Sequence, residues 1–146
     1  MSVQHLHEHA ADLLDLGGHR YTSGRRRIVG ALVEADGPTS VLDLIERGVG
    51  VSPSSLYRNL AVLERAGVVD RVVDLDRQAR FEPGEAITRR PHHHFICEQC
   101  GVVGEFELAD ETESALRRAL VRIASVTRFR IDSQRLDLFG TCSACP

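Results

Sequence analysis

Three histidines and two cysteines lie within one short segment, His92-His93-His94-Phe95-Ile96-Cys97-Glu98-Gln99-Cys100, and a second Cys-x-x-Cys pair, Cys142 and Cys145, follows near the end of the chain. Two such pairs at strand–turn boundaries bring four thiolates to one ion, and a tetrahedral sulfur site suits Zn²⁺ and closes its coordination shell. We therefore predict a structural zinc ion that ties the last residues to the start of the second half. The alternatives are a redox-active dithiol and inert core cysteines.

The histidine run predicts a second metal site of different chemistry. His92 and His94 alternate along an expected strand and therefore point to one face, whereas His93 points to the other. Glu82 closes the first half of the chain, and Glu105 follows on the neighbouring strand. Two imidazoles with one or two carboxylates bind Zn²⁺, Fe²⁺ or Mn²⁺ and release the ion more readily than four thiolates do. Because the ligands come from both halves, we predict a regulatory metal whose binding fixes the angle between them. The alternative is a solvated polar strand.

Helices are expected to form the first half of the chain. Capping residues and apolar spacing predict four helices, which begin after Ser2, after Thr22 or Ser23, after Thr39 or Ser40, and after Ser52. Pro53 occupies the first position of the fourth helix, which suits proline. The β-branched residues 68–73 and the segment 79–82 flank a polar turn and predict a hairpin. Small helices followed by a hairpin are typical of a winged helix-turn-helix, whose fourth helix enters the major groove of DNA.

Pro83-Gly84-Glu85 is predicted to be a hinge, and after it the sequence pattern predicts strands as well as a helix. Strands are expected on both sides of the Cys97–Cys100 knuckle, and Asp110 with Glu113 predicts a capping-box-like start to a helix. Further extended strands are expected between residues 129 and 138. The fold class is therefore α+β. It has a winged helix-turn-helix DNA-binding domain at residues 1–82, a hinge at 83–87, and a small α/β metal-binding domain at 88–146.

Composition limits the function classes. The net charge is −3 and every one of the 18 basic residues is arginine, which does not resemble a protein that coats nucleic acid without specificity. DNA binding must then come from local patches such as the one formed by Arg20, Arg25, Arg26 and Arg27. The sequence has no apolar run of membrane-spanning length and no signal peptide at its start, so a cytoplasmic location and no membrane partner are expected.

The fourth helix predicts how DNA is contacted. Its inward stripe is formed by Leu56, Leu60 and Leu63. The residues left to face outward near its N-terminus are Ser54, Ser55, Tyr57, Arg58 and Asn59. Hydroxyl groups at a helix N-terminus suit phosphates, Tyr57 can stack on a thymine methyl group, and Arg58 can reach guanine or phosphate. The alternative is that Tyr57 packs in the core.

Taken together and in order, these segments resemble the ferric uptake regulator (Fur) superfamily of metal-sensing transcription factors. The segments that carry the resemblance are Gly18-His19-Arg20-Tyr21-Thr22, Ser55-Leu56-Tyr57-Arg58-Asn59-Leu60, Ala66-Gly67-Val68-Val69, Arg80-Phe81-Glu82, His92 through Gly101, and Leu138-Phe139-Gly140-Thr141-Cys142. The resemblance implies a homodimer formed by the second halves, which makes residues 88–146 a dimerisation domain. It also implies a metal-dependent repressor of metal homeostasis genes that closes on a palindromic operator in double-stranded DNA.

The same resemblance assigns individual residues. It places Glu82, His92, His94 and Glu105 on the regulatory metal ligands, the four cysteines on the structural zinc, and Arg20 on the basic position that enters the minor groove. Tyr57-Arg58 matches the Tyr-Arg of the family's recognition helix.

Departures from the family pattern are informative. A histidine ligand often precedes the third helix in the family, and here Gly37-Pro38 stands in that place. Asp70 falls on an aspartate ligand of zinc-sensing members, although their cysteine near the hinge is missing. A further family site would need Pro91, His93, Thr112 and Gln134, of which three are poor ligands, so we predict that this site is absent or degenerate. Asp70 and His93 remain further candidate ligands. The N-terminal histidines, His5, His7 and His9, are expected on a solvated face.

Three rival functions remain open. A peroxide sensor of the same fold would oxidise His92 or His94 through bound Fe²⁺. A zinc-dependent hydrolase would use the histidine–carboxylate site with an open coordination position. It would lack an obvious substrate-binding loop, and the chain is therefore not expected to be an enzyme. A non-DNA-binding interaction module is the third. Glu82 and Glu105 favour Fe²⁺ or Mn²⁺ as the sensed ion, whereas Asp70 and His93 leave Zn²⁺ open.

Overall fold

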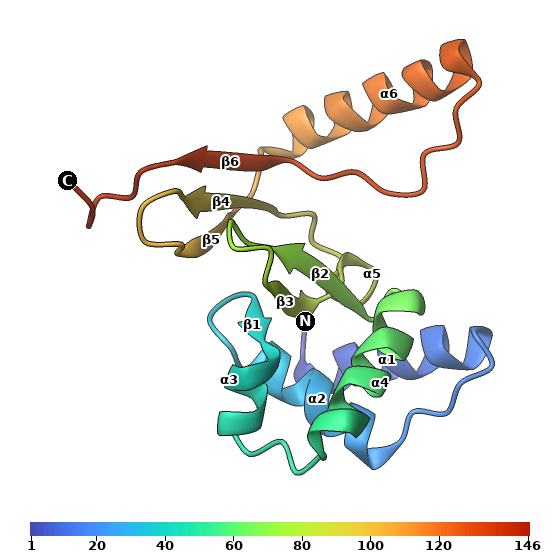
Figure 1. Ribbon diagram of the computed structural model, residues 1–146. Helices are drawn as coiled ribbons and strands as arrows, with labels where there is room; N and C mark the ends of the chain where they lie inside the picture. The colour runs from blue at the N-terminus through green and yellow to red at the C-terminus, as the bar shows by residue number, and fades with distance from the viewer. The chain divides into compact units, whose positions relative to one another are not determined.

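The computed structural model describes residues 1–146 and divides into two compact units, Met1–Arg90 and Pro91–Pro146 (Figure 1). The first is mainly helical with a small sheet, and the second combines a sheet with one long helix, which confirms the predicted α+β class. None of the helices has the length and apolar character needed to cross a membrane.

The first unit contains the predicted helices in the predicted order. Its elements are α1 (Val3–Leu16), α2 (Ser23–Val33), β1 (Thr39–Ser40), α3 (Val41–Glu46), α4 (Pro53–Arg65), β2 (Val69–Val73), β3 (Ala79–Pro83) and α5 (Glu85–Thr88). The side chains of Ser2, Thr22, Ser40 and Ser52 each accept a hydrogen bond from a backbone N–H in the first turn of the helix that follows. Local capping chemistry therefore determines where each of these helices begins.

One apolar core holds the first unit together. Leu14, Ile28, Leu44 and Leu60 are among its fully buried side chains, and they come from the four main helices in turn. Burial of a leucine or isoleucine of this kind contributes about 1.5–3 kcal/mol to folding. The core therefore fixes α4 against α2 and leaves the opposite face of α4 available to solvent.

The wing is a three-stranded antiparallel sheet in the order β1-β3-β2. The hairpin β2–β3 was predicted, whereas β1 was not, because it has only two residues and its pairs with β3, Thr39↔Phe81 and Ser40↔Arg80, join distant parts of the sequence. Gly84 then leaves the sheet at a close backbone approach, since a Cβ there would lie 2.5 Å from the carbonyl oxygen of Gly67. Helix α5 begins directly after it, within the segment predicted as a hinge.

The second unit is built on the sheet β5-β4-β6. Its elements are β4 (His93–Cys97), β5 (Val103–Phe106), α6 (Asp110–Thr127) and β6 (Asp137–Gly140). Strand β4 lies in the centre, antiparallel to β5 and parallel to β6. Of the extended residues predicted between 129 and 138, only Asp137 and Leu138 belong to a strand. Before them, the Leu136 carbonyl oxygen accepts a hydrogen bond of 3.4 Å from the backbone N–H of His94.

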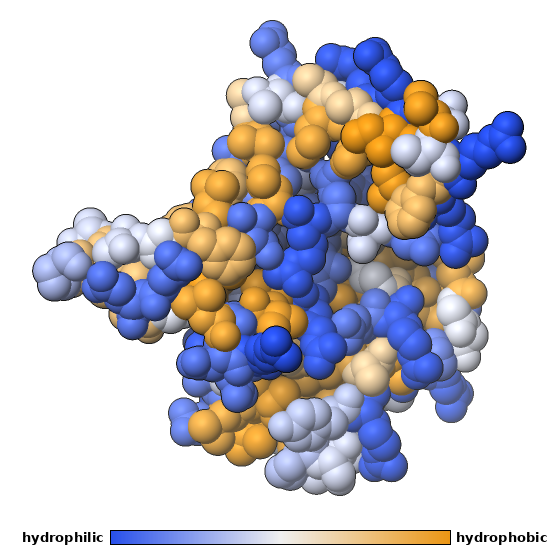
Figure 2. Space-filling view, turned by 45° about the horizontal axis from the view of Figure 1, so that its top comes forward, coloured by the Kyte–Doolittle hydropathy of each residue, from blue (hydrophilic) through white to orange (hydrophobic).

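Helix α6 differs from its prediction at its N-terminus, and it exposes apolar side chains. It begins after Ala109 without a side-chain cap, so the predicted capping box is wrong; Glu113 instead turns inward and is the only buried residue of the helix. Three large apolar side chains on α6 remain exposed, Val121 at 66%, Ile123 at 51% and Val126 at 79%, whereas Leu116 and Leu120 are half-buried. Exposed apolar groups are visible as orange surface in Figure 2. A long helix whose apolar side chains stay in water is typical of a surface that another chain covers.

Candidate metal centres and DNA-reading surface

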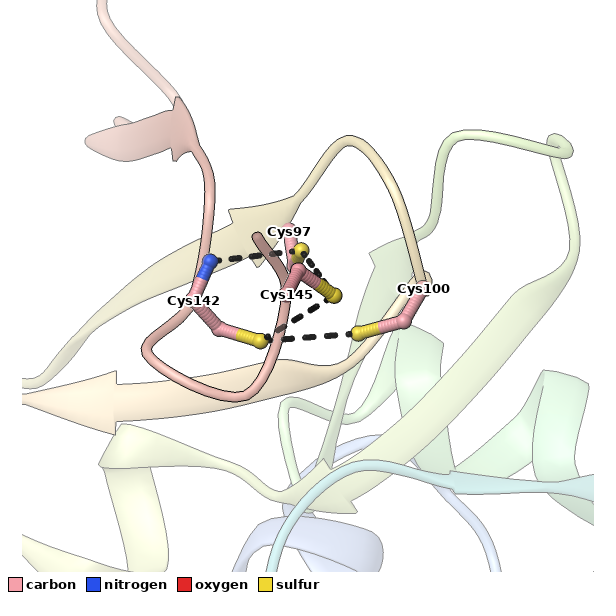
Figure 3. A group of neighbouring side chains, drawn as sticks. All are labelled: Cys97, Cys100, Cys142 and Cys145. Atoms are coloured by element: carbon pink, nitrogen blue, oxygen red, sulfur yellow. Dashed lines mark hydrogen bonds between the residues drawn. The ribbon is translucent and has the colours of Figure 1, made fainter.

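Four cysteines from two distant segments converge in the second unit (Figure 3). Cys97 ends β4 and Cys100 closes the turn that follows, while Cys142 and Cys145 lie in the segment after β6. Parallel pairing of β6 with β4 brings the two segments side by side, with Cys97 in register with Gly140. The backbone N–H of Cys142 donates to Cys97 Sγ at 3.4 Å, so the turn is already shaped around a thiolate acceptor.

The sulfur positions fit a tetrahedral ion. The Cys97–Cys145, Cys100–Cys142 and Cys142–Cys145 Sγ–Sγ distances are 3.8, 3.7 and 3.6 Å. Ligands held about 2.3 Å from a zinc ion at tetrahedral angles have sulfur–sulfur edges of about 3.8 Å. Disulfide bonding requires about 2.05 Å, and all four cysteines are free thiols. The four-cysteine cluster therefore has the size and ligand set of a structural zinc site.

The thiols differ in how readily they lose a proton. Backbone N–H groups of Cys100 and Cys142 stabilise the Cys97 thiolate and lower the pKa of that thiol to about 6. Hydrogen bonds with Cys142 and Cys100 raise the pKa of Cys145 to about 12. Cys97 is thus a better cation ligand at neutral pH than Cys145, whose thiol must lose its proton when an ion binds.

A mixed cluster of imidazoles and a carboxylate lies at the other end of β4. His94 and Glu105 face each other across the antiparallel β4–β5 pair. The rings of His92 and His94 are 5.2 Å apart and meet edge to face, so both lie on one side, as predicted. Ligand atoms of these three residues lie within 4.8 Å of one another. Two nitrogens and one oxygen can hold a divalent ion of the Fe²⁺, Mn²⁺ or Zn²⁺ type and leave room for further ligands.

Asp137 was missed by the sequence analysis and lies against this cluster. It is the β6 partner of His94, with Asp137 Oδ1 3.7 Å from His94 Nδ1, and Arg135 donates to Asp137 Oδ2 at 2.7 Å. Histidine ligands of metals commonly have a carboxylate at the second ring nitrogen, which orients the ring and raises its basicity. The sequence places Asp137 in an expected strand, but only the parallel register of β6 with β4 shows that it lies beside His94.

His93 occupies the opposite face of β4. His93 Nε2 lies 2.9 Å from Glu113 Oε2 on α6, and both side chains are buried. Thr112 and Gln134, which the further family site would need, are exposed, and Pro91 offers no side-chain donor or acceptor. The buried His93–Glu113 pair joins α6 to the sheet, and Glu113 is a second residue that the sequence analysis did not connect to this place.

Two acidic candidates belong to the first unit. Glu82 lies on β3, in register with Asp70 on β2, and is 2% exposed. Asp70 Oδ2 accepts a hydrogen bond of 3.0 Å from the backbone N–H of Glu85 at the start of α5. The Asp70 carboxylate therefore has a structural task at this helix terminus. Its predicted role as a metal ligand, and that of Glu82, remain predictions.

The N-terminal histidines do not form one solvated face, so that prediction is wrong for one of them. His5 is exposed, but His7 is buried, and its Nδ1 shares a hydrogen bond of 2.5 Å with the hydroxyl of Tyr21. Desolvation and the nearby Arg26 lower the pKa of His7. His9 Nδ1 lies 3.3 Å from the carbonyl oxygen of Ile87 in α5. His7 lies on the same apolar face of α1 as Leu6, Ala10 and Leu14, so the helical spacing in the sequence could have predicted its burial.

Helix α4 presents the predicted reading face. Leu56, Leu60 and Leu63 are at most 1% exposed, which places the opposite side of the helix in solvent. Tyr57 is 61% exposed, so it is not a core residue, and Arg58 is exposed with its Nη2 3.3 Å from Ser55 Oγ. Ser54 is exposed and Ser55 is half-buried beside it. Hydroxyls, a phenol and a guanidinium thus share the N-terminal half of one helix face.

The basic patch is less uniform than its sequence. Arg20 is exposed in the loop before α2. Arg25 donates from Nε to Asn59 Oδ1 at 3.0 Å and from Nη1 to the carbonyl oxygen of Arg20 at 2.5 Å. Arg27 donates to the carbonyl oxygens of Val49 and Gly50. Asn59 was expected to face outward freely, and that expectation is wrong because Arg25 holds its side chain.

Several known proteins are similar to this chain in sequence and in fold. Residues 17–139 match the ferric uptake regulator family. The peroxide operon regulator of Bacillus subtilis is 29% identical over 99% of this chain and 96% of its own length. The ferric uptake regulator of Helicobacter pylori superposes with a TM-score of 0.72 at 21% identity, covering 99% of this chain and 94% of that one. A zinc uptake regulator complexed with zinc and DNA superposes with a TM-score of 0.63 at 23% identity, covering 99% of this chain and 95% of that one.

The match spans the histidine and cysteine candidates at the two ends of β4, the whole of α4 and the complete wing, and the two-unit fold agrees with it. The chain belongs to the ferric uptake regulator family.

Proposed function

We propose that the chain is a metal-dependent, DNA-binding transcriptional repressor that acts as a homodimer on a palindromic operator of metal homeostasis genes. The observation that carries this proposal is the His92–His94–Glu105 cluster. It is an incomplete set of exchangeable ligands at the start of β4 and on its neighbour β5, and the four-cysteine cluster lies at the other end of β4. Family membership places the chain among transcription regulators, so it is not an enzyme and the hydrolase alternative is removed.

The regulatory site would be held by His92, His94 and Glu105 with Glu82 as the carboxylate from the first unit. When bound, a divalent ion supplies positive charge that offsets the two carboxylates and joins ligands from both units. His94 would be oriented by Asp137 on its other ring nitrogen. Bound metal and bound DNA would favour the same arrangement of the first unit. Metal would therefore raise the affinity for DNA, and DNA would raise the affinity for metal by the same factor.

Homodimer formation is supported by the exposed apolar surface of the second unit. Ile123 and Val126 on α6 and Phe139 on β6 are all at least half exposed. A twofold partner would cover these side chains with the same surface of a second copy. Two copies of α4 then meet two half-sites, which is the geometry that a palindromic operator requires.

DNA contact would come from α4 and the loop before α2. Ser54 and Ser55 would approach phosphates at the helix N-terminus, Tyr57 would stack on a thymine methyl group, and Arg58 would reach guanine or phosphate. Arg20 would enter the minor groove. The zinc uptake regulator that shares this fold is itself complexed with DNA, which supports a duplex as the partner.

Operator selection tests the proposal. Purified protein is mixed with a random duplex library and Mn²⁺, the enriched sequence is identified, and its affinity is measured with Mn²⁺, Zn²⁺, anaerobic Fe²⁺ or a chelator. We expect an inverted repeat that binds at least about tenfold more tightly with one of these ions than with the chelator. Equal affinity in all four conditions would contradict metal dependence, and no enriched sequence would contradict specific DNA binding.

A peroxide-responsive repressor is the second candidate, and the name of the Bacillus subtilis relative favours it. In that case Fe²⁺ held by His92 and His94 promotes oxidation of one imidazole, which removes a ligand and releases DNA. Mass spectrometry of the tryptic peptide that contains both histidines, taken after peroxide treatment of the Fe²⁺-loaded and Mn²⁺-loaded protein, separates the two candidates. Addition of one oxygen atom only in the Fe²⁺ sample supports peroxide sensing; its absence supports metal sensing.

A further inference from the structure

One guanidinium joins the two elements that the proposed function brings to DNA. Arg25 on α2 is half-buried and donates from Nε to Asn59 Oδ1 on α4 at 3.0 Å. Its Nη1 donates to the carbonyl oxygen of Arg20, in the loop before α2, at 2.5 Å. Asn59 directly follows Arg58 on the reading helix. The same side chain therefore contacts the neighbour of one DNA-contacting residue and the backbone of another.

The chemistry of arginine makes this contact rigid. The donors of a guanidinium lie in one plane at fixed angles, so two acceptors bound to it are held in a set relationship. The Arg20 carbonyl also accepts from the backbone N–H of Thr22 at 3.1 Å, which turns the loop immediately before α2.

A direct phosphate contact is the obvious alternative role for Arg25, since it belongs to the basic patch. Two of its donors already bind protein acceptors, and the side chain is half-buried, whereas Arg26 and Arg27 are exposed. Arg27 shows the same behaviour at a second place, where it holds the carbonyl oxygens of Val49 and Gly50 ahead of α4. Arg25 and Arg27 on α2 thus bind protein acceptors in the segments next to this helix.

We propose that Arg25 is a positioning residue that couples the Arg20 loop to the reading helix through Asn59. It fixes the separation between the minor-groove contact and the major-groove contacts, so that both are made on the same half-site. This inference rests on the proposed function for its effect on DNA, although the Arg25–Asn59 contact itself exists without DNA.

The test compares two variants that break the same contact from opposite sides. Arg25→Lys keeps the positive charge but removes the planar fork, and Asn59→Ala removes the acceptor but keeps the arginine. Each should weaken binding to the selected operator about tenfold, since a hydrogen bond to a charged group is lost. The double variant should be no weaker than Arg25→Lys alone, because that change already removes the Arg25–Asn59 hydrogen bond together with the one to the Arg20 carbonyl oxygen. Arg65→Lys, at the far end of α4, is the matched control and should bind as the unchanged protein does.

The salt dependence separates positioning from phosphate contact. Loss of a phosphate contact lowers the slope of log affinity against log salt concentration by about 0.9. We expect Asn59→Ala to keep the slope of the unchanged protein while it loses operator affinity. An unchanged operator affinity in Asn59→Ala and Arg25→Lys, together with a reduced slope in Arg25→Gln, would overturn the proposal and assign Arg25 to the phosphates.

A measurement without DNA keeps the test independent of the proposed function. In the full chain, the Arg25 Nε–H resonance should exchange slowly with solvent, and Asn59→Ala should make that exchange fast while circular dichroism stays unchanged. Fast exchange in the unchanged protein would show that the contact does not persist and would overturn the inference. If no duplex binds under any metal condition, the proposed function fails, and this exchange measurement still decides whether Arg25 holds Asn59.

Discussion

Two candidate metal sites with different donor sets lie at the two ends of strand β4. At its start, His92 and His94 with Glu105 combine nitrogen and oxygen donors and leave the coordination shell open. At its end, Cys97 joins three other cysteines in a set of four like donors that closes the shell. The backbone scaffold is shared, so the two sites differ in donor type and donor number. Under the proposed function, these differences would make metal binding permanent at one end of the strand and reversible at the other.

The largest effect is expected from the closed site. Cys97→Ser should release zinc and unfold the second unit, because structural zinc contributes about 10 kcal/mol or more at pH 7. That contribution is comparable to the total free energy of unfolding of a typical domain, about 5–15 kcal/mol. Zinc content by mass spectrometry and helicity by circular dichroism measure the outcome. Ser143→Ala, in the same loop between two ligands, is the control and should keep both zinc and fold; a folded, zinc-free Cys97→Ser protein would contradict the structural role.

Local sequence signals predicted most of the fold. Ser2, Thr22, Ser40 and Ser52 were found from capping chemistry, which depends on a few neighbouring residues and needs no knowledge of the tertiary structure. The four cysteines were found because Cys-x-x-Cys spacing itself reflects ligand geometry. Glu113 shows where this reasoning fails, since a capping box was the local interpretation and a buried histidine on another element proved to be the partner.

Contacts between elements were not predictable in the same way. Asp137 reaches His94 only because β6 pairs with β4 in parallel and in one register, and a shift by one residue would point it to the other face. Asn59 was assigned to solvent because the stripe of Leu56, Leu60 and Leu63 defines only the core side of α4. The helix flank that Arg25 contacts depends on how α2 crosses α4, and packing geometry decides that crossing.

The open site should respond to ligand loss without unfolding. His92→Ala combined with His94→Ala should lower the affinity for Mn²⁺ or Zn²⁺ at that site at least about 100-fold, which exceeds the usual effect of losing an outer-shell partner. Titration against a competing chelator measures the affinity, and circular dichroism measures the fold. His5→Ala combined with His9→Ala removes the same number of histidines from α1 and should leave the affinity unchanged. Unfolding of the His92/His94 variant would remove the contrast between the two ends of β4.

A smaller effect is expected from the residue behind His94. Asp137→Asn should lower metal affinity at the open site about 10- to 100-fold, because the amide neither orients the ring as strongly nor raises its basicity. Zinc at the four-cysteine cluster should stay bound, which separates this effect from damage to β6. Asp132→Asn removes an exposed carboxylate that also pairs with an arginine and serves as the matched control. Equal affinities for the two variants would show that Asp137 does not act on His94.

The smallest effect concerns a histidine that binds no metal in this scheme. His7 shares its hydrogen bond with Tyr21, and burial together with Arg26 lowers the pKa of His7 below its ordinary 6.5. The unfolded chain therefore takes up a proton first as the pH falls. The contribution of His7 to stability is complete above pH 6.5 and is lost as the pH drops from there toward the folded-state pKa. Acid should thus loosen the first unit by a route that does not involve the proposed metal ligands.

Tyrosine fluorescence can isolate that route. The only two tyrosines, Tyr21 and Tyr57, both lie in the first unit, and the chain has no tryptophan. With chelator present, thermal unfolding followed by this signal should shift to lower temperature between pH 7.5 and 5.5. His7→Gln should cost about 1 kcal/mol at pH 7.5, where the hydrogen bond is intact, and should flatten the pH dependence. Tyr21→Phe is unsuitable for this fluorescence signal but can be compared by circular dichroism. An unchanged pH dependence in His7→Gln would assign the acid response to other groups, and the contrast between metal-binding and proton-binding histidines would then fail.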